Sequence, residues 1–359
     1  MACGFEKKGI ILPESEALNW SGKGQHIEYT IDEQSKIPLR VERLLGHSAT
    51  AIVEAVRCRR IRLARKSIRC NRHLSPYEAI SEVQHLQKVK HFHIIRVVGT
   101  YIIKKNLSIL LYPVTEWNLE EFMDDTVDQL SETKDFSNSY EHRTRSLALR
   151  TFFGCISHAL QYIHNRNIKH MDIKPKNFLV RSIKTPLSDR IDNYKIYLAD
   201  FGIARSYSNP QDAETDSWTS FTRMYAAPEV VQQAKRSFSA DIFSFGCVMV
   251  EMLATILTTR SSNFRSDLHR NRINPHSDTS YQANVPFIKQ WVAGLDKQAF
   301  LDPIYDHARK TKLDLLEKIL LCLDPVPMFR PTAAHLAACT ELLRCLDCSK
   351  GSEPFEAAE

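Results

Sequence analysis

The apolar positions divide the chain into a β-rich first part and a helical second part. Five short segments rich in β-branched and aliphatic residues predict strands at residues 39–45, 51–57, 60–68, 95–103 and 107–114. Between the third and the fourth segment, Ile80, Val83, Leu86 and, more loosely, Val89 recur at helical spacing. The first part is therefore expected to form a five-stranded sheet with one helix over residues 76–89.

After residue 114 the pattern is typical of buried helices. An apolar stripe runs along residues 143–163, and residues 240–257 and 313–322 follow the same pattern. Residues 258–302 are rich in Asn, Ser, Arg and His and predict a long connection with one short helix at 287–295. We expect this part of the chain to be mainly helical.

The two ends of the chain carry weaker patterns. Residues 1–36 lack sustained periodicity and are expected to be an N-terminal extension that docks or stays loose. The first residues contain no hydrophobic signal region. Residues 344–359 are expected to be a frayed C-terminal tail.

Composition narrows the class of protein. With 43% hydrophobic and 25% charged residues in 359, the chain is close to the average of soluble globular proteins, and one bilobal enzyme would fit its length. The net charge of +6 is modest and mostly dispersed, so binding of nucleic acid is not expected. The longest apolar stretch, residues 247–257, is interrupted by Glu251, so no membrane span is expected. A monomeric, soluble protein of the cytoplasm or nucleus is the resulting prediction.

The nine cysteines are scattered and odd in number, which favours reduced thiols in an intracellular compartment. Cys345 and Cys348 have the spacing of half a zinc or redox site. The sequence offers no second CxxC or pair of histidines nearby to complete four ligands. Free thiols near the end of a C-terminal helix are therefore the favoured interpretation.

Three short segments in a fixed order carry candidate chemistry. Residues 169–177 read KHMDIKPKN, residues 198–202 read LADFG and residues 225–229 read YAAPE. In this order they resemble the catalytic loop, the metal-binding DFG segment and the APE segment of the protein kinase family. The resemblance runs from about residue 37 to 343. It implies an α+β, bilobal protein-kinase fold, with a small β-rich N-lobe that has one helix (37–114) and a larger, mainly helical C-lobe (115–343).

Phosphoryl transfer needs a proton acceptor for the hydroxyl, oxygen ligands for Mg²⁺ and cations on the phosphates. Asp172 follows a long apolar helix and precedes Asn177 by five residues, so one loop can aim a carboxylate at a substrate and an amide oxygen at a metal. The resemblance implies that Asp172 accepts the proton and that Lys174 neutralises charge on the transferred phosphate. It also implies that Asn177 and Asp200 hold Mg²⁺.

The resemblance also implies a binding site for ATP. Residues 63–66, LARK, look like the third-strand segment of the family, so Lys66 is the candidate cation for the α- and β-phosphates. Its expected partner is Glu82 on the following helix, with Glu78 as the rival. The expected adenine contacts come from the sheet and the hinge after it: Val53, Ala64, Leu111, Tyr112 and Val114.

The turn that covers the phosphates departs from the family. Gly46 and Val53 are present, but Ser48 and Ala51 stand where the family usually has glycine. Their backbone N–H groups can still face phosphate, although a Cβ restricts φ and close approach, so weaker nucleotide binding is expected. Met171 is a second departure, because many members have an arginine there that pairs with a phosphorylated loop residue.

Several further residues match supporting positions of the family. The resemblance implies that Thr222 hydrogen-bonds Asp172 and Lys174, that Asp241 caps the catalytic-loop backbone, and that Arg330 pairs with Glu229. Five acidic residues between 116 and 125 are interpreted as a helix start, with a preference for basic substrates as the alternative.

These observations predict an enzyme that moves the γ-phosphoryl group of ATP onto serine or threonine hydroxyls of protein substrates, with Mg²⁺. The alternative is a nucleotide-binding pseudokinase that acts as a scaffold or regulatory module. The two missing glycines in the turn that covers the phosphates suggest this alternative. The intact set of residues required for catalysis favours the enzyme: Lys66, Glu82, Asp172, Asn177 and Asp200. A small-molecule kinase of related fold is disfavoured by the APE segment.

Overall fold

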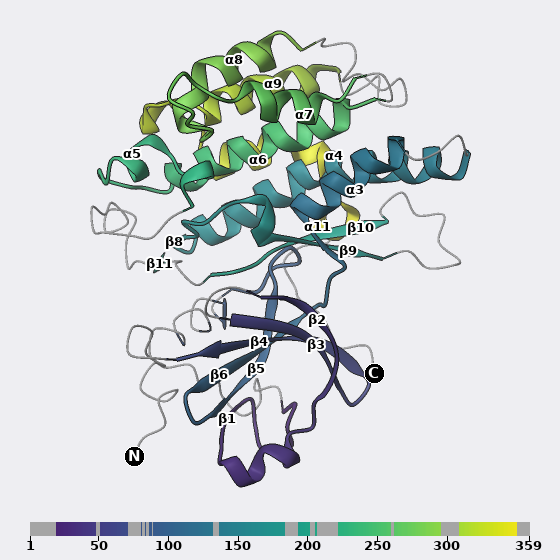
Figure 1. Ribbon diagram of the computed structural model, residues 1–359. Helices are drawn as coiled ribbons and strands as arrows, with labels where there is room; N and C mark the ends of the chain where they lie inside the picture. The colour runs from purple at the N-terminus through teal and green to yellow at the C-terminus, as the bar shows by residue number, and fades with distance from the viewer. Residues whose placement is uncertain are drawn as a thin grey trace. The chain divides into compact units, whose positions relative to one another are not determined.

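The computed structural model describes residues 19–47, 51–70, 80, 83, 86–87, 89–131, 136–183, 193–201, 205–206, 222–259, 262–295 and 309–349. The chain forms two compact units, coloured along the sequence in Figure 1. The first contains residues up to Lys90, Ile94–Thr115 and Asp200–Gly202. The second contains His91–His93, Glu116–Ala199 and the chain from Ile203. One unit is built on a sheet and the other is mainly helical, which confirms the α+β, bilobal fold class.

The first unit is built on a six-stranded sheet in the order β1-β5-β6-β4-β3-β2. Its strands are β1 (His26–Tyr29), β2 (Arg40–His47), β3 (Ala51–Cys58), β4 (Ile61–Arg69), β5 (Arg96–Ile103) and β6 (Asn106–Tyr112). All neighbouring strands are antiparallel except β1, which pairs with β5 in parallel. The prediction of five strands is wrong, because β1 and the short 3₁₀ helix η1 (Ile31–Lys36) come from the segment expected to be an extension.

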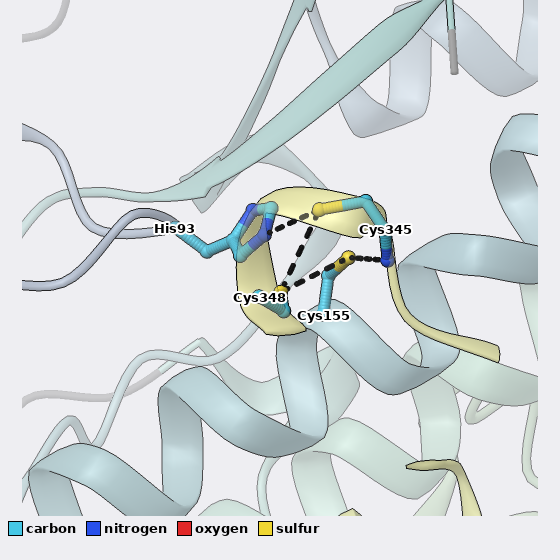
Figure 2. Close-up of side chains that lie close together, drawn as sticks. All are labelled: His93, Cys155, Cys345 and Cys348. Carbon is cyan, nitrogen blue, oxygen red and sulfur yellow. Dashed lines mark hydrogen bonds between the residues drawn. The ribbon is translucent and has the colours of Figure 1, made fainter. Parts of the chain in front are cut away.

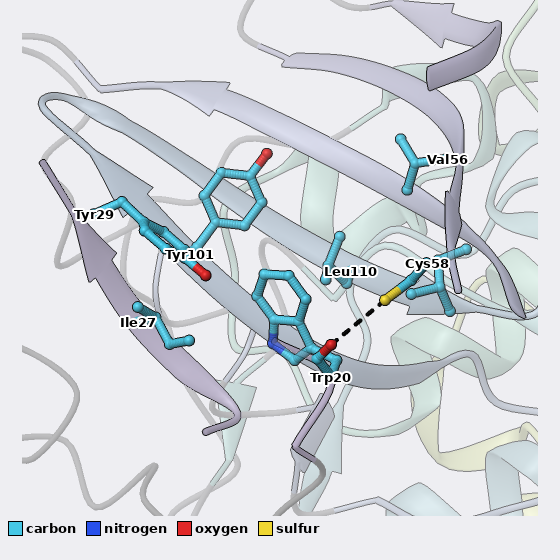
Figure 3. Close-up of a cluster of buried hydrophobic side chains, with 8 residues drawn as sticks. Trp20, Ile27, Tyr29, Val56, Cys58, Tyr101 and Leu110 are labelled. Carbon is cyan, nitrogen blue, oxygen red and sulfur yellow. Dashed lines mark hydrogen bonds between the residues drawn. The ribbon is translucent and has the colours of Figure 1, made fainter. Parts of the chain in front are cut away.

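Aromatic packing docks the segment before β1 onto the sheet. Trp20 is buried against Tyr101 and Cys58 (Figure 3). Its indole N–H donates to the carbonyl of Gln25 at 2.9 Å. Gly99 makes room for this ring, since a Cβ built there would lie 2.5 Å from the carbonyl oxygen of Gln25 and closer still to the indole. A mostly polar segment without periodicity is thus held by burial of one large aromatic side chain.

The helix expected over residues 76–89 is described only in part. Residues 80, 83, 86 and 87 are helical. Ile80, Val83, Leu86 and Val89 are all at most 4% exposed, which confirms the predicted apolar face. The remaining residues of this segment, Glu78 and Glu82 among them, lie outside the described residues.

The second unit is mainly helical. Its α-helices are α3 (Leu119–Ser131), α4 (Phe136–His164), α5 (Pro228–Val231), α6 (Ser239–Leu257), α7 (Phe264–Asn271), α8 (Val285–Ala293), α9 (Arg309–Cys322), α10 (Ala333–Cys339) and α11 (Leu346–Ser349). Its short strands are β7 (Trp117–Asn118), β8 (Ile168–Lys169), β9 (Phe178–Ser182), β10 (Tyr194–Leu198) and β11 (Arg205–Ser206). Its 3₁₀ helices are η2 (Pro175–Asn177), η4 (Arg223–Tyr225), η5 (Gln282–Asn284), η7 (Pro327–Phe329) and η8 (Glu341–Leu343).

The apolar stripes located the main helices of this unit. Residues 143–163, 240–257 and 313–322 lie in α4, α6 and α9, and the short helix expected at 287–295 is α8. The pattern missed α7, which lies in the polar stretch. Contrary to the expectation of a frayed tail, residues 346–349 form α11, and Cys345 just before it is buried.

Helix α6 is the central helix of the second unit and packs against α4, α7 and α9 (Figure 1). Its 19 residues reach a mean hydropathy of 1.8, so by length and composition it could cross a membrane, although no such segment was expected. In the structure, 94% of the apolar 18-residue stretch of this helix is buried inside the protein. The two acids of this helix, Asp241 and Glu251, are each 1% exposed and hydrogen-bonded, as in a protein core.

Candidate active site

Strand register places the expected nucleotide contacts of the first unit on one face of its sheet. Val53 pairs with Lys66 and with Gly46, and Ala64 pairs with Leu111. Directly paired residues share a face, and so do residues two apart on a strand, such as Ala64 and Lys66. Five of the predicted positions are therefore brought together on this face: Gly46, Val53, Ala64, Lys66 and Leu111.

The hinge after β6 also belongs to the first unit. Tyr112 follows Leu111, so its side chain lies on the opposite face, where it packs against the cluster around Trp20. Only the backbone of Tyr112 can therefore contribute on the nucleotide face. Val114 follows Pro113, whose peptide bond with Tyr112 is cis.

Lys66 and Asp200 form an ion pair within the first unit. The Nζ of Lys66 lies 2.8 Å from Oδ1 of Asp200, across 134 residues of sequence. Asp200 has a φ of 64°, a left-handed conformation that is uncommon outside glycine. The ammonium group and the carboxylate that the sequence assigned to the phosphates and the metal thus meet in space. Glu82, Glu78 and Ser48 lie outside the described residues, so their predicted roles stay predictions.

Three side chains of the second unit contact the carboxylate of Asp172 in the catalytic loop. Lys174 Nζ donates to Oδ2 of Asp172 at 2.7 Å, and the hydroxyl of Thr222 donates to Oδ1 at 2.8 Å. Asn177 Nδ2 donates to the same Oδ2 at 2.9 Å and to the carbonyl of Asp172 at 2.8 Å. Lys174 also reaches the hydroxyl of Thr222 at 2.9 Å, which confirms both hydrogen bonds expected of Thr222.

These contacts fix how the groups can act. The hydrogen bonds from the Asn177 amide nitrogen orient its amide oxygen as the atom that can bind a cation. Lys174 and Thr222 hold the carboxylate of Asp172 from both of its oxygens, so its rotamer is restricted. The 3₁₀ helix η2, which begins with Pro175, sets the spacing between Asp172 and Asn177.

A buried aspartate on α6 holds the loop in place. Oδ2 of Asp241 accepts from the backbone N–H of His170 at 2.8 Å, and Oδ1 accepts from that of Met171 at 2.7 Å. His164 Nε2 lies 3.0 Å from Oδ2. Burial alone would raise the pKa of Asp241, but the hydrogen bond with His164 and the donors of the loop lower it overall. The expected cap is confirmed; His164, which ends α4, is a partner that the motifs did not indicate.

Met171 has a φ of 67°, so the loop passes through a left-handed conformation one residue before Asp172. Such a conformation costs a non-glycine residue about 1–2 kcal/mol, which the hydrogen bond from Met171 to Asp241 helps to offset. The cap on α6 therefore determines the direction in which the Asp172 side chain leaves the backbone.

The APE segment is anchored by the predicted ion pair. Arg330 Nη1 and Nη2 lie 2.6 and 2.8 Å from the two oxygens of Glu229, and the side chain of Arg330 is fully buried. This bidentate pair ties α5 to the start of the segment that leads into α10.

The acidic residues after the hinge are paired with other groups of the second unit. Glu121 accepts from the backbone N–H of Asn118 and so caps the start of α3. Asp124 lies 2.9 Å from Arg265, and Glu120 lies 3.2 Å from Lys176. These contacts favour the interpretation as a helix start over a surface that selects basic substrates.

The donor set suits Mg²⁺ and a phosphate chain. The Asp200 carboxylate and the Asn177 amide oxygen are hard oxygen donors of the kind that Mg²⁺ prefers. The Lys66 side chain is 17% exposed, and its ammonium group pairs with the carboxylate of Asp200. Asn177 belongs to the second unit and Asp200 to the first.

Comparison with known proteins gives one family and several distant relatives. The model of the protein kinase domain matches residues 39–340. The chain is 32% identical to the serine/threonine-protein kinase nekl-2 of Caenorhabditis elegans over 173 residues, which are 48% of this chain and 43% of that protein. It is 30% identical to the calcium/calmodulin-dependent protein kinase cmkA of Emericella nidulans over 232 residues, 64% of this chain and 50% of that protein. A match to the cyclin-dependent kinase E-1 of Arabidopsis thaliana has 27% identity over 177 residues, 49% of this chain and 34% of that protein. The chain therefore spans half or less of the length of these curated relatives.

Proposed function

Because this chain belongs to the protein kinase family, we propose that it transfers the γ-phosphoryl group of ATP to serine or threonine hydroxyls of other proteins. The observation that carries the proposal is the hydrogen-bonded set around Asp172, in which a lysine, a threonine and an asparagine all contact one carboxylate. This arrangement presents a proton acceptor and a cation side by side. The serine/threonine class is supported by Lys174 and Thr222, and by relatives named as serine/threonine-protein kinases.

In the proposed mechanism Asp172 orients the substrate hydroxyl and accepts its proton as the bond to phosphorus forms. Thr222 and Lys174 keep its carboxylate in one orientation. The ammonium group of Lys174 also neutralises charge on the phosphoryl group during transfer. Lys66 positions the α- and β-phosphates, and it is itself positioned by Asp200. Asn177 and Asp200 would hold Mg²⁺, which would neutralise charge on the phosphate oxygens.

The test is transfer of labelled phosphate from ATP to a degenerate peptide library, with Mg²⁺ and the purified full chain. Asp172→Asn keeps the shape of the side chain and removes its basicity, so the rate should fall about 10²–10⁴-fold. Asp267→Asn is the matched control, because Asp267 is a half-exposed residue of α7 that pairs with Arg270. Its activity should equal that of the wild type.

The outcomes separate the enzyme from the scaffold. Transfer that survives in Asp172→Asn would contradict the role of Asp172. Absence of transfer in both proteins, together with ATP-dependent thermal stabilisation of the wild type, would favour the pseudokinase, which the serine and alanine in the phosphate-covering turn suggest. Phosphate found mainly on tyrosine would contradict the serine/threonine assignment.

A further inference from the structure

Three cysteines and one histidine meet at one point of the second unit, away from the catalytic loop. Cys155 lies in the middle of α4, Cys345 and Cys348 lie at the C-terminal helix α11, and His93 precedes β5. Figure 2 shows the four side chains pointing toward one another. Their ligand atoms all lie within 4.8 Å of one another. The free-thiol interpretation of Cys345 and Cys348 therefore overlooked two neighbours that complete a set of four.

We propose that His93, Cys155, Cys345 and Cys348 bind one zinc ion that fastens the C-terminal helix α11 to helix α4. The site is proposed as structural because four protein ligands fill a tetrahedral ion and leave no position for a substrate.

Three of the six distances within the cluster lie near the edges of a zinc tetrahedron. With Zn–S bonds of about 2.3 Å, two thiolates of one tetrahedral site lie about 3.8 Å apart. Here the sulfur of Cys348 lies 3.6 Å from that of Cys345 and 3.8 Å from that of Cys155. His93 Nε2 lies 3.2 Å from the sulfur of Cys345, against about 3.6 Å expected for a nitrogen and a sulfur of one site. The other three separations are at most 4.8 Å, so binding of the ion would draw the four side chains together by up to about 1 Å.

The histidine is oriented as zinc-binding histidines are. Nδ1 of His93 lies 2.6 Å from the carbonyl oxygen of Ile196 in β10, and this contact requires Nδ1 to be the donor. In a neutral imidazole the lone pair then lies on Nε2, the nitrogen that faces Cys345. A hydrogen bond from the second ring nitrogen to a backbone carbonyl is the usual support of a histidine that binds metal.

The chemical environment favours zinc among the common metals. Thiolate and imidazole are soft or borderline ligands, and a tetrahedral set of three sulfurs and one nitrogen is typical of Zn²⁺. His93 and Cys155 are each 1% exposed and Cys345 is 7% exposed, while Cys348 is half-buried and offers a path of entry. Three thiolates leave the loaded site with one net negative charge. Arg344 lies beside it, where its guanidinium donates to the carbonyl of Cys348 at 3.2 Å.

The proposed ion would join segments that are far apart in the sequence. His93 and Cys345 are separated by 252 residues. The backbone of His93 also accepts from Leu198 N–H at 2.8 Å, and Lys195 of β10 pairs with Asp347 of α11 at 2.8 Å. The metal would thereby hold together α4, α11 and β10, the strand that leads into the DFG segment.

The experiment measures metal in the full chain and needs no kinase activity, so its failure differs from failure of the proposed function. The protein is produced with zinc in the medium and purified under a non-thiol reductant, and its zinc is determined by mass spectrometry. One zinc per chain is expected in the wild type.

Cys348→Ser, a conservative change at the half-exposed ligand, should weaken zinc binding by more than about 100-fold in competition with a chromophoric chelator. Cys339→Ser, at a half-buried cysteine of α10 outside the cluster, is the matched control and should bind zinc as the wild type does.

Reconstitution with Co²⁺ gives a second readout. The wild type and Cys339→Ser should show the intense visible bands and the thiolate charge-transfer absorption of tetrahedral cobalt, and both should be lost or shifted in Cys348→Ser. Zinc-free protein without a cobalt spectrum would overturn the proposal. So would zinc content that Cys348→Ser leaves unchanged. A Cys345–Cys348 disulfide in protein kept from air would likewise overturn it, in favour of a redox pair.

Discussion

Replacing Asp241 by asparagine tests how the catalytic loop is held. The carboxylate accepts three hydrogen bonds, from His164 and from the backbone N–H groups of His170 and Met171. An amide of the same shape has only one acceptor atom. Its NH₂ group must therefore face at least one of these donors, and the site is 1% exposed, so water cannot substitute.

The size of the effect follows from these contacts. Loss of one hydrogen bond to a charged acceptor costs about 1.5–3 kcal/mol. The hydrogen bonds that remain are weaker, because their acceptor is then a neutral amide and no longer a carboxylate. We expect Asp241→Asn to destabilise the protein by about 3 kcal/mol, which lowers the melting temperature by roughly 6–12 °C for a unit of this size. The left-handed conformation of Met171 also loses its support. Misplacement of the adjacent Asp172 by about 1 Å should lower activity about 100-fold.

The assay is thermal melting together with phosphate transfer, for Asp241→Asn and for the control Asp267→Asn, whose effect on stability should stay within about 0.5 kcal/mol. The pKa of Asp241 is lowered in the folded state. The stability that its ionised carboxylate adds is therefore fully present at pH values above the ordinary pKa of a carboxyl group, and it is lost as the pH falls through the lowered pKa. The difference between wild type and Asp241→Asn should therefore shrink in acid. Wild-type melting and activity in Asp241→Asn at neutral pH would refute the assigned role of the cap.

Three further predictions rest on other contacts. Arg330→Met leaves the Glu229 carboxylate buried without its bidentate partner and should cost about 3–5 kcal/mol in denaturant unfolding, whereas a loss below about 1 kcal/mol would contradict it. Burial lowers the pKa of His26 to about 4, so stability should fall as the pH drops from about 6.5 to 4, by up to about 3 kcal/mol. His26→Gln should flatten this pH dependence of melting, and an unchanged slope would contradict the assignment. Met171 is uncharged and cannot pair with phosphate, so phosphatase treatment should leave most of the activity; near-complete loss would count against this.

The residues of the candidate active site could be found from the sequence because phosphoryl transfer demands certain side chains at short, fixed spacings. Asp172, Lys174 and Asn177 lie within one loop, and a loop of fixed length brings them together in the same way wherever it occurs. The same holds for periodicity, which located α4, α6 and α9 because each buries one broad apolar stripe or is apolar throughout. Local signals thus gave the family and the chemistry.

Other features depend on contacts between distant segments, for which spacing carries no signal. Trp20 and Gly99 are unremarkable in the sequence, yet their close packing adds a sixth strand to the sheet. The predicted helix ended at residue 163, one residue before His164, and only the fold places His164 against Asp241. The clearest case is the cluster in Figure 2, where Cys345 and Cys348 carried half of a recognisable motif and the other half lay 190 residues away or more. Side chains that distant in the chain meet only because the packing of α4, β10 and α11 brings them together, and that packing is a property of the whole core.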